Sequence, residues 1–482
     1  MFLSHLPPEL KLSIVEHLDP ESSLRFALTN RYHSKLCQAI LREHTRLFAE
    51  HSIIEANDAG PVVLWNALRE ILRDPRKGWY VRELNLPNSR EELVTDIIPE
   101  EDLKLYKDAA QEISSFCAYQ PTFFAAEPDD DPGDFDESMD NLIESGTEEA
   151  AVVLLIHHLP QLRTFRMTDG GRRTGACLEL FMHRVAAGYQ DPTLAPRMPL
   201  QHLRTAAIAH YDSEGSCNIA WAVYFLCVPS LRTFAAQSMG SEGLDEHEGG
   251  SGSYLRNVTG APVSNVEELS FDYCQFDSQS LQVILSMLKN LKRFSYQSGG
   301  ATVAYSDYEP RRVIEALATY AGHSLEEAEL LGCEIGFEDG DNDLLFTSLQ
   351  GFTTLKALRC ETRWLLRSHD TGLGDGEALS QGFHSVEDAE EAITDPRDNL
   401  PESLEELYLD GVYEDEEWEQ LTELFKNPNT STPKLTLEKT CVMRHSKAWD
   451  RRGVQEKVGG AAEPGIRFTN PLHMSIWDGH GY

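Results

Sequence analysis

Hydrophobic residues near the start of the chain recur at helical spacing. Leu10, Ile14 and Leu18 lie four residues apart, as they would on one face of a helix. Two shorter apolar stripes follow, and Asp19 and Asn30 precede them at positions suited to capping a helix. The further apolar members of these stripes are Val15, Leu24, Ala27, Leu28, Tyr32, Leu36 and Ile40. The pattern predicts a module of three short helices within residues 1–50.

Such a module is too small to close a good core alone. Domains below about 40 residues usually need a metal, a disulfide or a partner. The opening helices contain no set of residues that could supply the first two. Their apolar faces must therefore be covered either by the rest of the chain, with the module acting as a cap, or by another protein.

A different pattern, apolar-x-x-apolar-x-apolar, returns along the remainder of the chain. The nine copies are VRELNL (81–86), LRTFRM (162–167), LRTAAI (203–208), LRTFAA (231–236), VEELSF (266–271), LKRFSY (291–296), LEEAEL (325–330), LKALRC (355–360) and LEELYL (404–409). Helix-like segments lie between several copies, at irregular intervals that bracket a repeat period of about 20–29 residues plus insertions. We expect an α/β array of stacked parallel strands with outer helices.

Residues that favour the ends of helices mark the boundaries of the predicted helices. Ser278 is expected to cap 279–288, Pro310 to open 311–320, Gly322 to close that helix, and Asp415 to cap 416–426. In two repeats a cysteine, Cys274 or Cys333, comes three residues after the hexamer.

The predicted organisation is a helical module at 1–50, a helical linker at 51–80, the array at 81–440 with acidic insertions at 87–147, 237–265 and 361–403, and a tail or cap at 441–482.

The chain is strongly acidic, with a formal net charge of −37 over 482 residues. Nucleic acid and anionic membranes are therefore poor partners, because their phosphates would be repelled. The nine cysteines are scattered singly, which favours reduced thiols, and no signal segment or membrane-length apolar run is present. We expect a cytoplasmic or nuclear protein.

Charge is patterned along the predicted strands. From residue 266 onward the sign alternates from repeat to repeat, through Glu267 and Glu268, Lys292 and Arg293, Glu326 and Glu327, Lys356 and Arg359, and Glu405 and Glu406. This favours an ion-pair ladder over ligand recognition. The earlier repeats instead carry arginines without an acidic counterpart at the equivalent positions, namely Arg163, Arg166, Arg204 and Arg232. These arginines are candidate contacts for an acidic ligand, and the acidic segment 127–140 either is a solvated loop or competes for them.

Motifs of common enzymes and metal sites are missing from the sequence. It has no G-x-S-x-G, no H-E-x-x-H and no phosphate-binding G-x-x-x-x-G-K-[ST], and the calcium-loop-like run 339–343 is followed by Leu344 where glycine is needed. We therefore predict no catalytic residue, no metal site and no cofactor, and a non-enzymatic role.

The opening sequence LPPELKLSIVEHLDPESSLRFALTNRYHSKLC (6–37) resembles the F-box. It is most similar to fungal F-box proteins in which the F-box starts within the first few residues of the chain. The resemblance covers about residues 3–48. The matching positions are Leu6, Pro7, Pro8, Glu9, Leu10, Ile14, Leu18, Leu24 and Leu28. The tryptophan often found in the third helix is absent, and Tyr32 and His33 lie in that region. The later repeats are similar to the degenerate leucine-rich arrays that often follow an F-box. In such arrays an Asn or Cys side chain forms hydrogen bonds to the backbone of the turn after a strand.

These resemblances imply a substrate-recognition adaptor. The F-box-like module would dock to the Skp-family adaptor of a cullin–RING ubiquitin ligase through the matching positions above, and the leucine-rich array would bind an unknown protein substrate. The alternative is a ligase-independent scaffold whose helical module caps the first repeat.

Overall fold

The computed structural model of the protein describes residues 6–56, 62–87, 98–117, 135–169, 176–210, 215–241, 263–299, 310–331, 348–361, 399–412, 440–445 and 454–458. These residues form an α/β protein with parallel strands. The chain divides into two compact units, one made of residues 1–211 with 227–231 and the other of residues 212–226 with 232–482.

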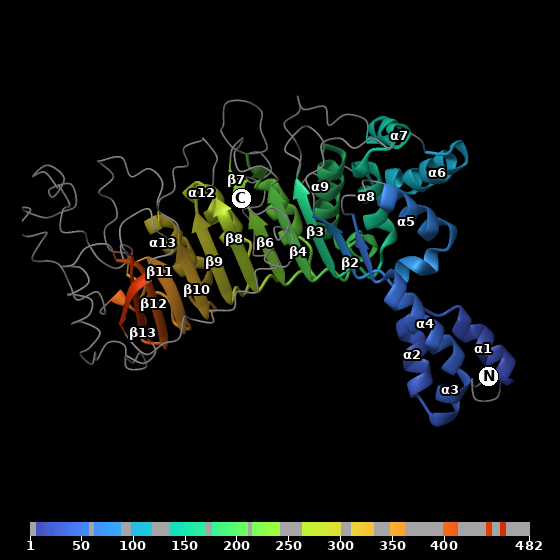
Figure 1. Ribbon diagram of the computed structural model, residues 1–482, viewed down its shortest axis with the longest axis horizontal. Helices are drawn as coiled ribbons and strands as arrows, with labels where there is room; N and C mark the ends of the chain where they lie inside the picture. Colours follow the sequence, from blue (N-terminus) through green and yellow to red (C-terminus); the bar gives the residue numbers. More distant parts are fainter. Residues whose placement is uncertain are drawn as a thin grey trace, which may run out of the picture. The chain divides into compact units, whose positions relative to one another are not determined.

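The first unit begins with four short helices, drawn in dark blue in Figure 1: α1 (Pro8–Glu16), α2 (Pro20–Leu28), α3 (Arg31–Leu36) and α4 (Gln38–His51). We call residues 6–51 the N-terminal module. The third predicted helix is in fact two helices, because the chain turns at Cys37, which ends α3 and precedes α4. The Cys37 side chain is fully buried in the module, so the turn is fixed by packing that the apolar spacing alone does not reveal.

Four strands of the first unit are parallel, in the order β1 (Ile53–Glu55), β2 (Glu83–Leu86), β3 (Thr164–Asp169) and β4 (Thr205–His210). The segments between them contain α5 (Val62–Arg73), the 3-10 turn η2 (Pro75–Trp79), α6 (Glu100–Cys117), α7 (Phe135–Ser145), α8 (Glu148–His158), α9 (Ala176–Gln190) and the 3-10 turn η4 (Ala195–Arg197). Helix α8 is buried on nearly every side from Ala150 to Ile156 and forms the centre of this unit.

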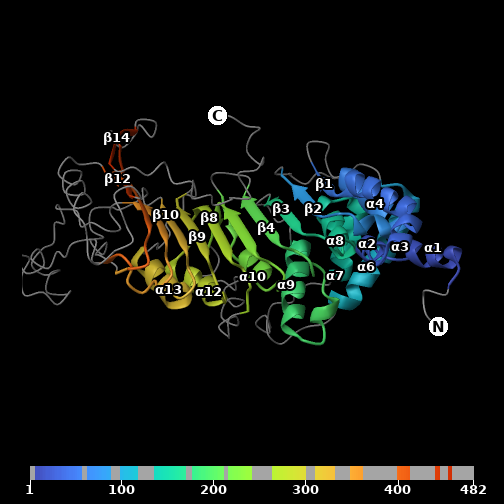
Figure 2. The ribbon, with the colours of Figure 1, turned by 90° about the horizontal axis from the view of Figure 1, so that it is seen from below.

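The second unit continues the same construction. Its parallel strands follow in the order β6 (Thr233–Gln237), β8 (Glu268–Cys274), β9 (Arg293–Ser298), β10 (Glu327–Leu331), β11 (Ala357–Glu361), β12 (Glu406–Val412) and β13 (Thr440–His445), and β14 (Val454–Val458) pairs antiparallel to β13. A separate short pair joins β5 (Cys217–Asn218) and β7 (Met239–Gly240). Figure 2 shows α10 (Ala220–Leu226), α12 (Ser278–Ser286) and α13 (Pro310–Ala321) on one face of these strands.

Each of the nine hexamers contains a strand that begins at its third residue. The first, fourth and sixth positions of every hexamer are buried, from Val81, Leu84 and Leu86 in the first copy to Leu404, Leu407 and Leu409 in the last. Parallel pairing aligns these positions, so that Phe294 lies beside Leu269 and Ala328. The predicted parallel strands are thus confirmed, and the three apolar positions of the repeat form the core.

Aromatic side chains extend this core through the second unit. Phe271 lies at the centre of a group in which its ring centroid is 4.8 Å from that of Phe276, 6.4 Å from that of Tyr296 and 6.3 Å from that of Phe234. All four side chains are fully buried. Such edge-to-face contacts add to the stabilisation that comes from burying the rings.

Hydroxyl groups connect neighbouring repeats at the start of several strands. Ser324 Oγ donates to the carbonyl oxygen of Leu291 at 2.8 Å, Thr354 Oγ1 to that of Leu325 at 2.9 Å, and Ser403 Oγ to that of Leu355 at 2.8 Å. Each donor immediately precedes a hexamer, and each acceptor is the first residue of the preceding one. The hydroxyl thus satisfies a carbonyl where the strand ladder has not yet begun.

Cys274 is the last residue of β8, and its side chain contacts the strand segments that precede β8. Its fully buried Sγ accepts from the Met239 N–H of β7 at 3.4 Å and lies 3.8 Å from the carbonyl oxygen of Ala236 in β6. Burial raises the pKa of the thiol well above its usual range. Cys333, predicted to act in the same way, lies outside the described residues.

The predicted helix boundaries are right in part. Pro310 opens α13 and Gly322 ends it, where an added Cβ would lie 2.4 Å from the Ala318 carbonyl oxygen. The predicted cap Ser278 is wrong: the side chain of Asp277 accepts from the Ser280 N–H at 2.8 Å, and Ser278 is the first helical residue. A carboxylate accepts from a helix N-terminus more strongly than a hydroxyl does. Asp415 lies outside the described residues.

The segments predicted as linker, insertion and tail contain further regular structure. Strand β1 lies in the predicted linker 51–80, α6 and α7 lie in the insertion 87–147, and β13 and β14 lie at or beyond the end of the predicted array. Residues 242–262 and 362–398, which make up most of the predicted insertions 237–265 and 361–403, lie outside the described residues. No helix in the described part of the chain combines the length and apolar character needed to cross a membrane.

Candidate functional site

The helices of the N-terminal module form where the sequence supplies caps. Pro7 and Pro8 enter α1, where a missing N–H is harmless. Asp19 accepts from the Ser22 N–H at 2.9 Å at the start of α2, and Asn30 accepts from the His33 N–H at 2.8 Å at the start of α3. Both predicted caps are confirmed. Burial opposes ionisation of Asp19, but the hydrogen bonds from Ser22 and from the backbone of Glu21 and Asp19 together outweigh it and lower its pKa.

The core of the module is very small. It consists of Val15, Ala27 and Cys37, which are almost completely buried. The partly buried side chains packed against it are those of Leu18, Phe26, Ile40 and Leu41. On α1 the inward face is formed by Lys11 and Val15, four residues apart, and Leu18 packs against the core just after the helix ends. The Lys11 Nζ lies 5.2 Å from the centroid of the Tyr32 ring.

Half of the apolar residues in the predicted stripes therefore point outward. Leu10 and Ile14 on α1 are 52% and 40% exposed, and Leu24 and Leu28 on α2 are 47% and 75% exposed. Tyr32 on α3 is 50% exposed. We call these five residues the exposed apolar set. They make up five of the nine large hydrophobic side chains that are exposed within the described residues, so exposed apolar surface is concentrated on α1–α3.

The remaining residues that match the F-box pattern lie near this set. Pro7, Pro8 and Glu9 are exposed at the beginning of α1, and Leu6 is half-buried. Leu18 differs from its neighbours on the predicted stripe, since it is half-buried and packs against the module core. The sequence does not separate Leu18 from Leu10 and Ile14, because all three share one spacing.

Contact between the module and the strands of the first unit is made through α4 and the residue after it. His44 Nδ1 hydrogen-bonds to the Tyr80 hydroxyl, and the Arg82 guanidinium lies 5.5 Å from the Phe48 ring centroid. The Ser52 carbonyl oxygen accepts from the Arg82 N–H at 2.8 Å. Burial lowers the pKa of His44, although the Glu43 carboxylate opposes this shift. These contacts leave the exposed apolar set uncovered.

The arginines predicted to bind an acidic ligand are not equivalent. The prediction that Arg166 lacks an acidic counterpart is wrong: its Nη1 is 3.1 Å from Glu83 Oε2 and donates to Asn85 Oδ1 at 3.0 Å. Arg163 is exposed, Arg204 donates to the Ser230 carbonyl oxygen at 3.3 Å, and Arg232 donates to that of Asn265 at 3.4 Å.

Arg82 was not among the sequence candidates, yet its backbone lies next to that of Arg163. The Arg163 N–H donates to the Arg82 carbonyl oxygen, and Arg204 follows in the same way. Burial and the neighbouring Arg163 guanidinium lower the pKa of Arg82. Three arginines thus immediately precede three adjacent strands of the first unit. The equivalent hexamer position of Arg82 could have identified it in the sequence.

Part of the predicted ion-pair ladder is present in the second unit. Lys292 Nζ lies 2.7 Å from Glu267 Oε2, and Arg293 Nη2 lies 2.7 Å from Glu268 Oε2. Lys356 pairs with Glu326, but Arg359 pairs with Glu329 rather than with Glu327. Glu327 is left among carboxylates, and burial together with Glu268 raises its pKa against the opposing effect of Arg293. These charges hold neighbouring strands together.

Only part of the acidic segment 127–140 lies within the described structure. Residues 127–134 lie outside it, whereas 135–140 form the first turns of α7, where Met139 is buried. The second half of the segment is therefore helical rather than a loop. Within the described residues no group of three or more His, Cys, Asp or Glu side chains is arranged to hold a metal ion.

Two histidines buried in the first unit have strongly lowered pKa values. Burial, reinforced by His158, lowers the pKa of His157 to about 4, with Glu112 opposing, and burial together with Arg184 lowers that of His183 to about 4. His157 lies on α8 and His183 on α9.

The sequence matches no known family model, and no curated protein is detectably similar to it.

Proposed function

We propose that the protein is the substrate-recognition adaptor of a cullin–RING ubiquitin ligase, with the N-terminal module acting as an F-box that docks to the Skp-family adaptor. The observation that carries this proposal is the exposed apolar set on α1–α3, whose members are 40–75% exposed while every apolar position of the nine hexamers is buried. Large exposed apolar residues gathered on one small module are typical of a surface that binds another protein.

The competing proposal is a ligase-independent scaffold in which the module caps the first repeat. A cap would direct its apolar stripes toward the strands. In the described residues Leu10, Ile14, Leu24 and Leu28 of α1 and α2 instead remain exposed. The strand region is contacted by His44 and Phe48 of α4. This arrangement favours a missing partner over a cap.

We further propose that the strand region is an irregular leucine-rich array that binds the substrate. Three features support this proposal: the burial of positions one, four and six in each hexamer, the parallel neighbouring strands, and the hydrogen-bonded thiol of Cys274 at the end of β8. Proteins of this kind bind partners on the exposed strand surface. The arginines that immediately precede β2, β3 and β4, namely Arg82, Arg163 and Arg204, are candidate contacts for an acidic part of the substrate.

In this proposal the protein performs no bond chemistry itself. It holds a substrate near the ubiquitin-charged enzyme of the ligase, which makes the transfer effectively intramolecular. The exposed leucines would act as interface hot spots, where a single truncation typically costs 2 kcal/mol or more of binding free energy.

The test is a double substitution on α1. Leu10→Asp with Ile14→Asp places two carboxylates where the partner would remove water, so we expect loss of the Skp-family adaptor from co-purified complexes. Because both side chains are exposed, the free energy of unfolding should change little. The matched control is Ile53→Asp with Val62→Asp, which alters two similarly exposed aliphatic residues outside the module, at 51% and 49% exposure.

The expected result is adaptor binding by the wild type and the control and none by the α1 variant. Undiminished binding by the α1 variant, in protein with an unchanged unfolding curve, would exclude this surface as the docking site.

A further inference from the structure

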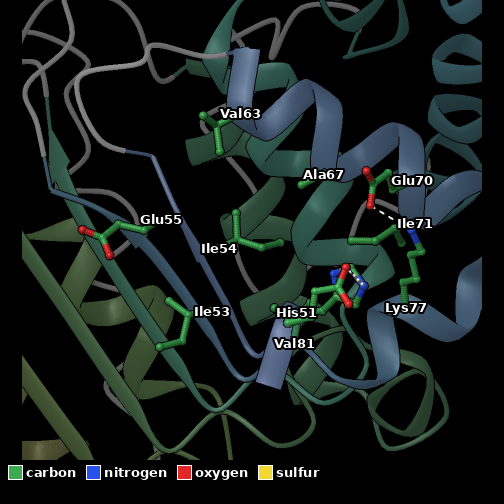
Figure 3. A pocket seen from close by; sticks show the side chains of 11 residues that line it. His51, Ile53, Ile54, Glu55, Val63, Ala67, Glu70, Ile71, Lys77 and Val81 are labelled. Atoms are coloured by element: carbon green, nitrogen blue, oxygen red, sulfur yellow. Dashed lines mark hydrogen bonds and ion pairs between the residues drawn. The ribbon is translucent and has the colours of Figure 1, made fainter. Parts of the chain in front are cut away.

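A cavity of about 400 Å³ lies beside β1, outside the exposed apolar set. It is bounded by the end of α4, by β1, by α5 and by η2 with the residues that follow it (Figure 3). The lining residues are Glu50, His51, Ile53, Ile54, Glu55, Val63, Ala67, Glu70, Ile71, Lys77 and Val81. The cavity is open to solvent on one side, so it is a groove rather than an internal void.

One wall of the groove is the free edge of a strand. Among the strands that the structure describes, β1 is the first in its sheet and pairs only with β2. The bonds to β2 use the Ser52 carbonyl oxygen and the Ala56 N–H, which fixes the alternation of the ladder. The backbone groups of Ile53 and Glu55 therefore point to the other side, where the described part of the chain supplies no hydrogen-bonding partner. An unpaired edge of this kind is a template for another strand.

The opposite wall is an apolar face of α5. Val63, Ala67 and Ile71 lie four residues apart on this helix and face the groove, and the Ile54 side chain points toward them from β1 (Figure 3). Ala67 stands at the middle of this row, and its single methyl group leaves room that a larger residue would fill. The other face of α5, with Leu64 and Leu68, is buried in the first unit.

The rim of the groove is acidic. Glu50, Glu55 and Glu70 line it, against one lysine, Lys77, whose Nζ is 2.8 Å from Glu70 Oε2. Glu50 is also paired, with Arg46 of α4. Glu55 is exposed, and no basic side chain in the described residues forms an ion pair with it. A cationic side chain beside Glu55 would be favoured as a cross-strand neighbour.

From these features we propose that the groove is a strand-addition site, which accepts an extended segment of another polypeptide with alternating apolar and basic residues. The segment pairs with the backbone of Ile53 and Glu55 and extends the sheet by one strand. Its apolar side chain opposite Ile54 enters the groove against α5, and a basic neighbour lies opposite Glu55. The alternation follows from the strand geometry, because successive side chains point to opposite faces.

This site is separate from the proposed adaptor-binding surface and does not depend on it. Its probe is a fluorescein-labelled heptapeptide of alternating lysine and valine, titrated against the full chain and followed by fluorescence anisotropy. Two further peptides control for general attraction to an acidic protein. One carries N-methyl groups on alternate backbone nitrogens and keeps every charge, and the other has glutamate in place of lysine.

We expect saturable binding of the lysine–valine peptide, at least tenfold weaker binding of the N-methylated form, and no binding of the glutamate form. Ala67→Trp fills the groove and should also weaken binding at least tenfold. Glu55→Lys, a surface change that should leave the fold intact, should weaken it several-fold, while Glu101→Lys, at an exposed acid of α6, should have no effect. Thermal unfolding of each variant provides the check on folding.

Equal affinity for the N-methylated peptide would show charge attraction without strand pairing and would overturn the proposal, as would the absence of saturable binding. Insensitivity to both Glu55→Lys and Ala67→Trp would place the peptide elsewhere and overturn it too. The α1 double variant should bind the peptide normally, and Ala67→Trp should retain the Skp-family adaptor. The two proposals can therefore fail independently.

Discussion

The N-terminal module and the strand array use apolar residues in opposite ways. In the array, all three apolar positions of each hexamer are buried, and Phe271 is in contact with aromatic residues on several sides. In the module, the most regular apolar stripe, Leu10 and Ile14, points to solvent, and the core is formed by the residues next to it on the helix. Regular spacing thus identifies an apolar face without identifying what covers it.

The difference follows from how each region can bury surface. A strand in the array has neighbours in the same sheet and helices on one face, so each repeat completes the core of the next. The module has four short helices and only three buried apolar side chains at its centre, which cannot accommodate every apolar residue that it contains. The surplus is available for a partner.

The largest expected contrast comes from truncating one residue in each region. Phe271→Ala removes a fully buried ring and should lower the free energy of unfolding by about 3–5 kcal/mol. Leu24→Ala removes a side chain that is 47% exposed and should cost less than about 1 kcal/mol. Chemical denaturation of both variants measures the contrast. Similar costs at the two positions would mean that Leu24 is buried in solution.

Acid should destabilise the first unit through its buried histidines. The pKa of His157 and of His183 is about 4 in the folded state, below the ordinary value near 6.5, so the unfolded chain takes up protons first as the pH falls. Stability should be unaffected by these groups above pH 6.5 and fall between about pH 6.5 and 4, by up to about 1.4 kcal/mol per pH unit for each histidine. Denaturation at several pH values tests this, and His183→Gln should flatten the slope; an unchanged slope would contradict the assignment.

A smaller effect is expected from the hydroxyls that join neighbouring repeats. Ser324→Ala removes the donor to the Leu291 carbonyl oxygen in a buried environment and should cost about 1–2 kcal/mol. Ser286→Ala is the comparison, since its hydroxyl bonds only within α12. A cost at Ser324 no larger than at Ser286 would show that the link between repeats does not contribute.

The smallest expected effect is at the ion-pair ladder. Lys292→Ala breaks the pair with Glu267, whose members are both about 40% exposed, and should cost about 0.2–1 kcal/mol. The cost should shrink as salt is added, because exposed charges are screened. An effect that is large or independent of salt would indicate a role other than holding adjacent strands.

Much of the array could be predicted from the sequence, because the hexamer is a local pattern whose buried positions recur in every copy. The ion pairs of Lys292 and Arg293 were also predictable, since neighbouring strands bring equivalent positions together. What could not be predicted depends on distant or very short segments. Strand β1 has only three residues and no hexamer, and Arg166 meets Glu83 across two adjacent strands that are far apart in the chain.

The module shows the complementary limit. The caps at Asp19 and Asn30 follow from local hydrogen bonding and were predicted correctly. The division of one predicted helix at Cys37, and the choice of Val15 over Ile14 for the core, are set by packing between helices. A stripe of spaced apolar residues contains no information about which of two adjacent faces turns inward.

The central claim is that a foreign subunit covers the exposed apolar set. Isothermal titration calorimetry of the full chain with purified Skp-family adaptor at several temperatures tests it most directly, because burial of apolar surface gives a negative heat-capacity change. We predict one-to-one binding with a clearly negative heat-capacity change, both abolished by Leu10→Asp with Ile14→Asp. Absence of binding by the wild type, or binding that the double variant retains with the same heat-capacity change, would contradict the claim.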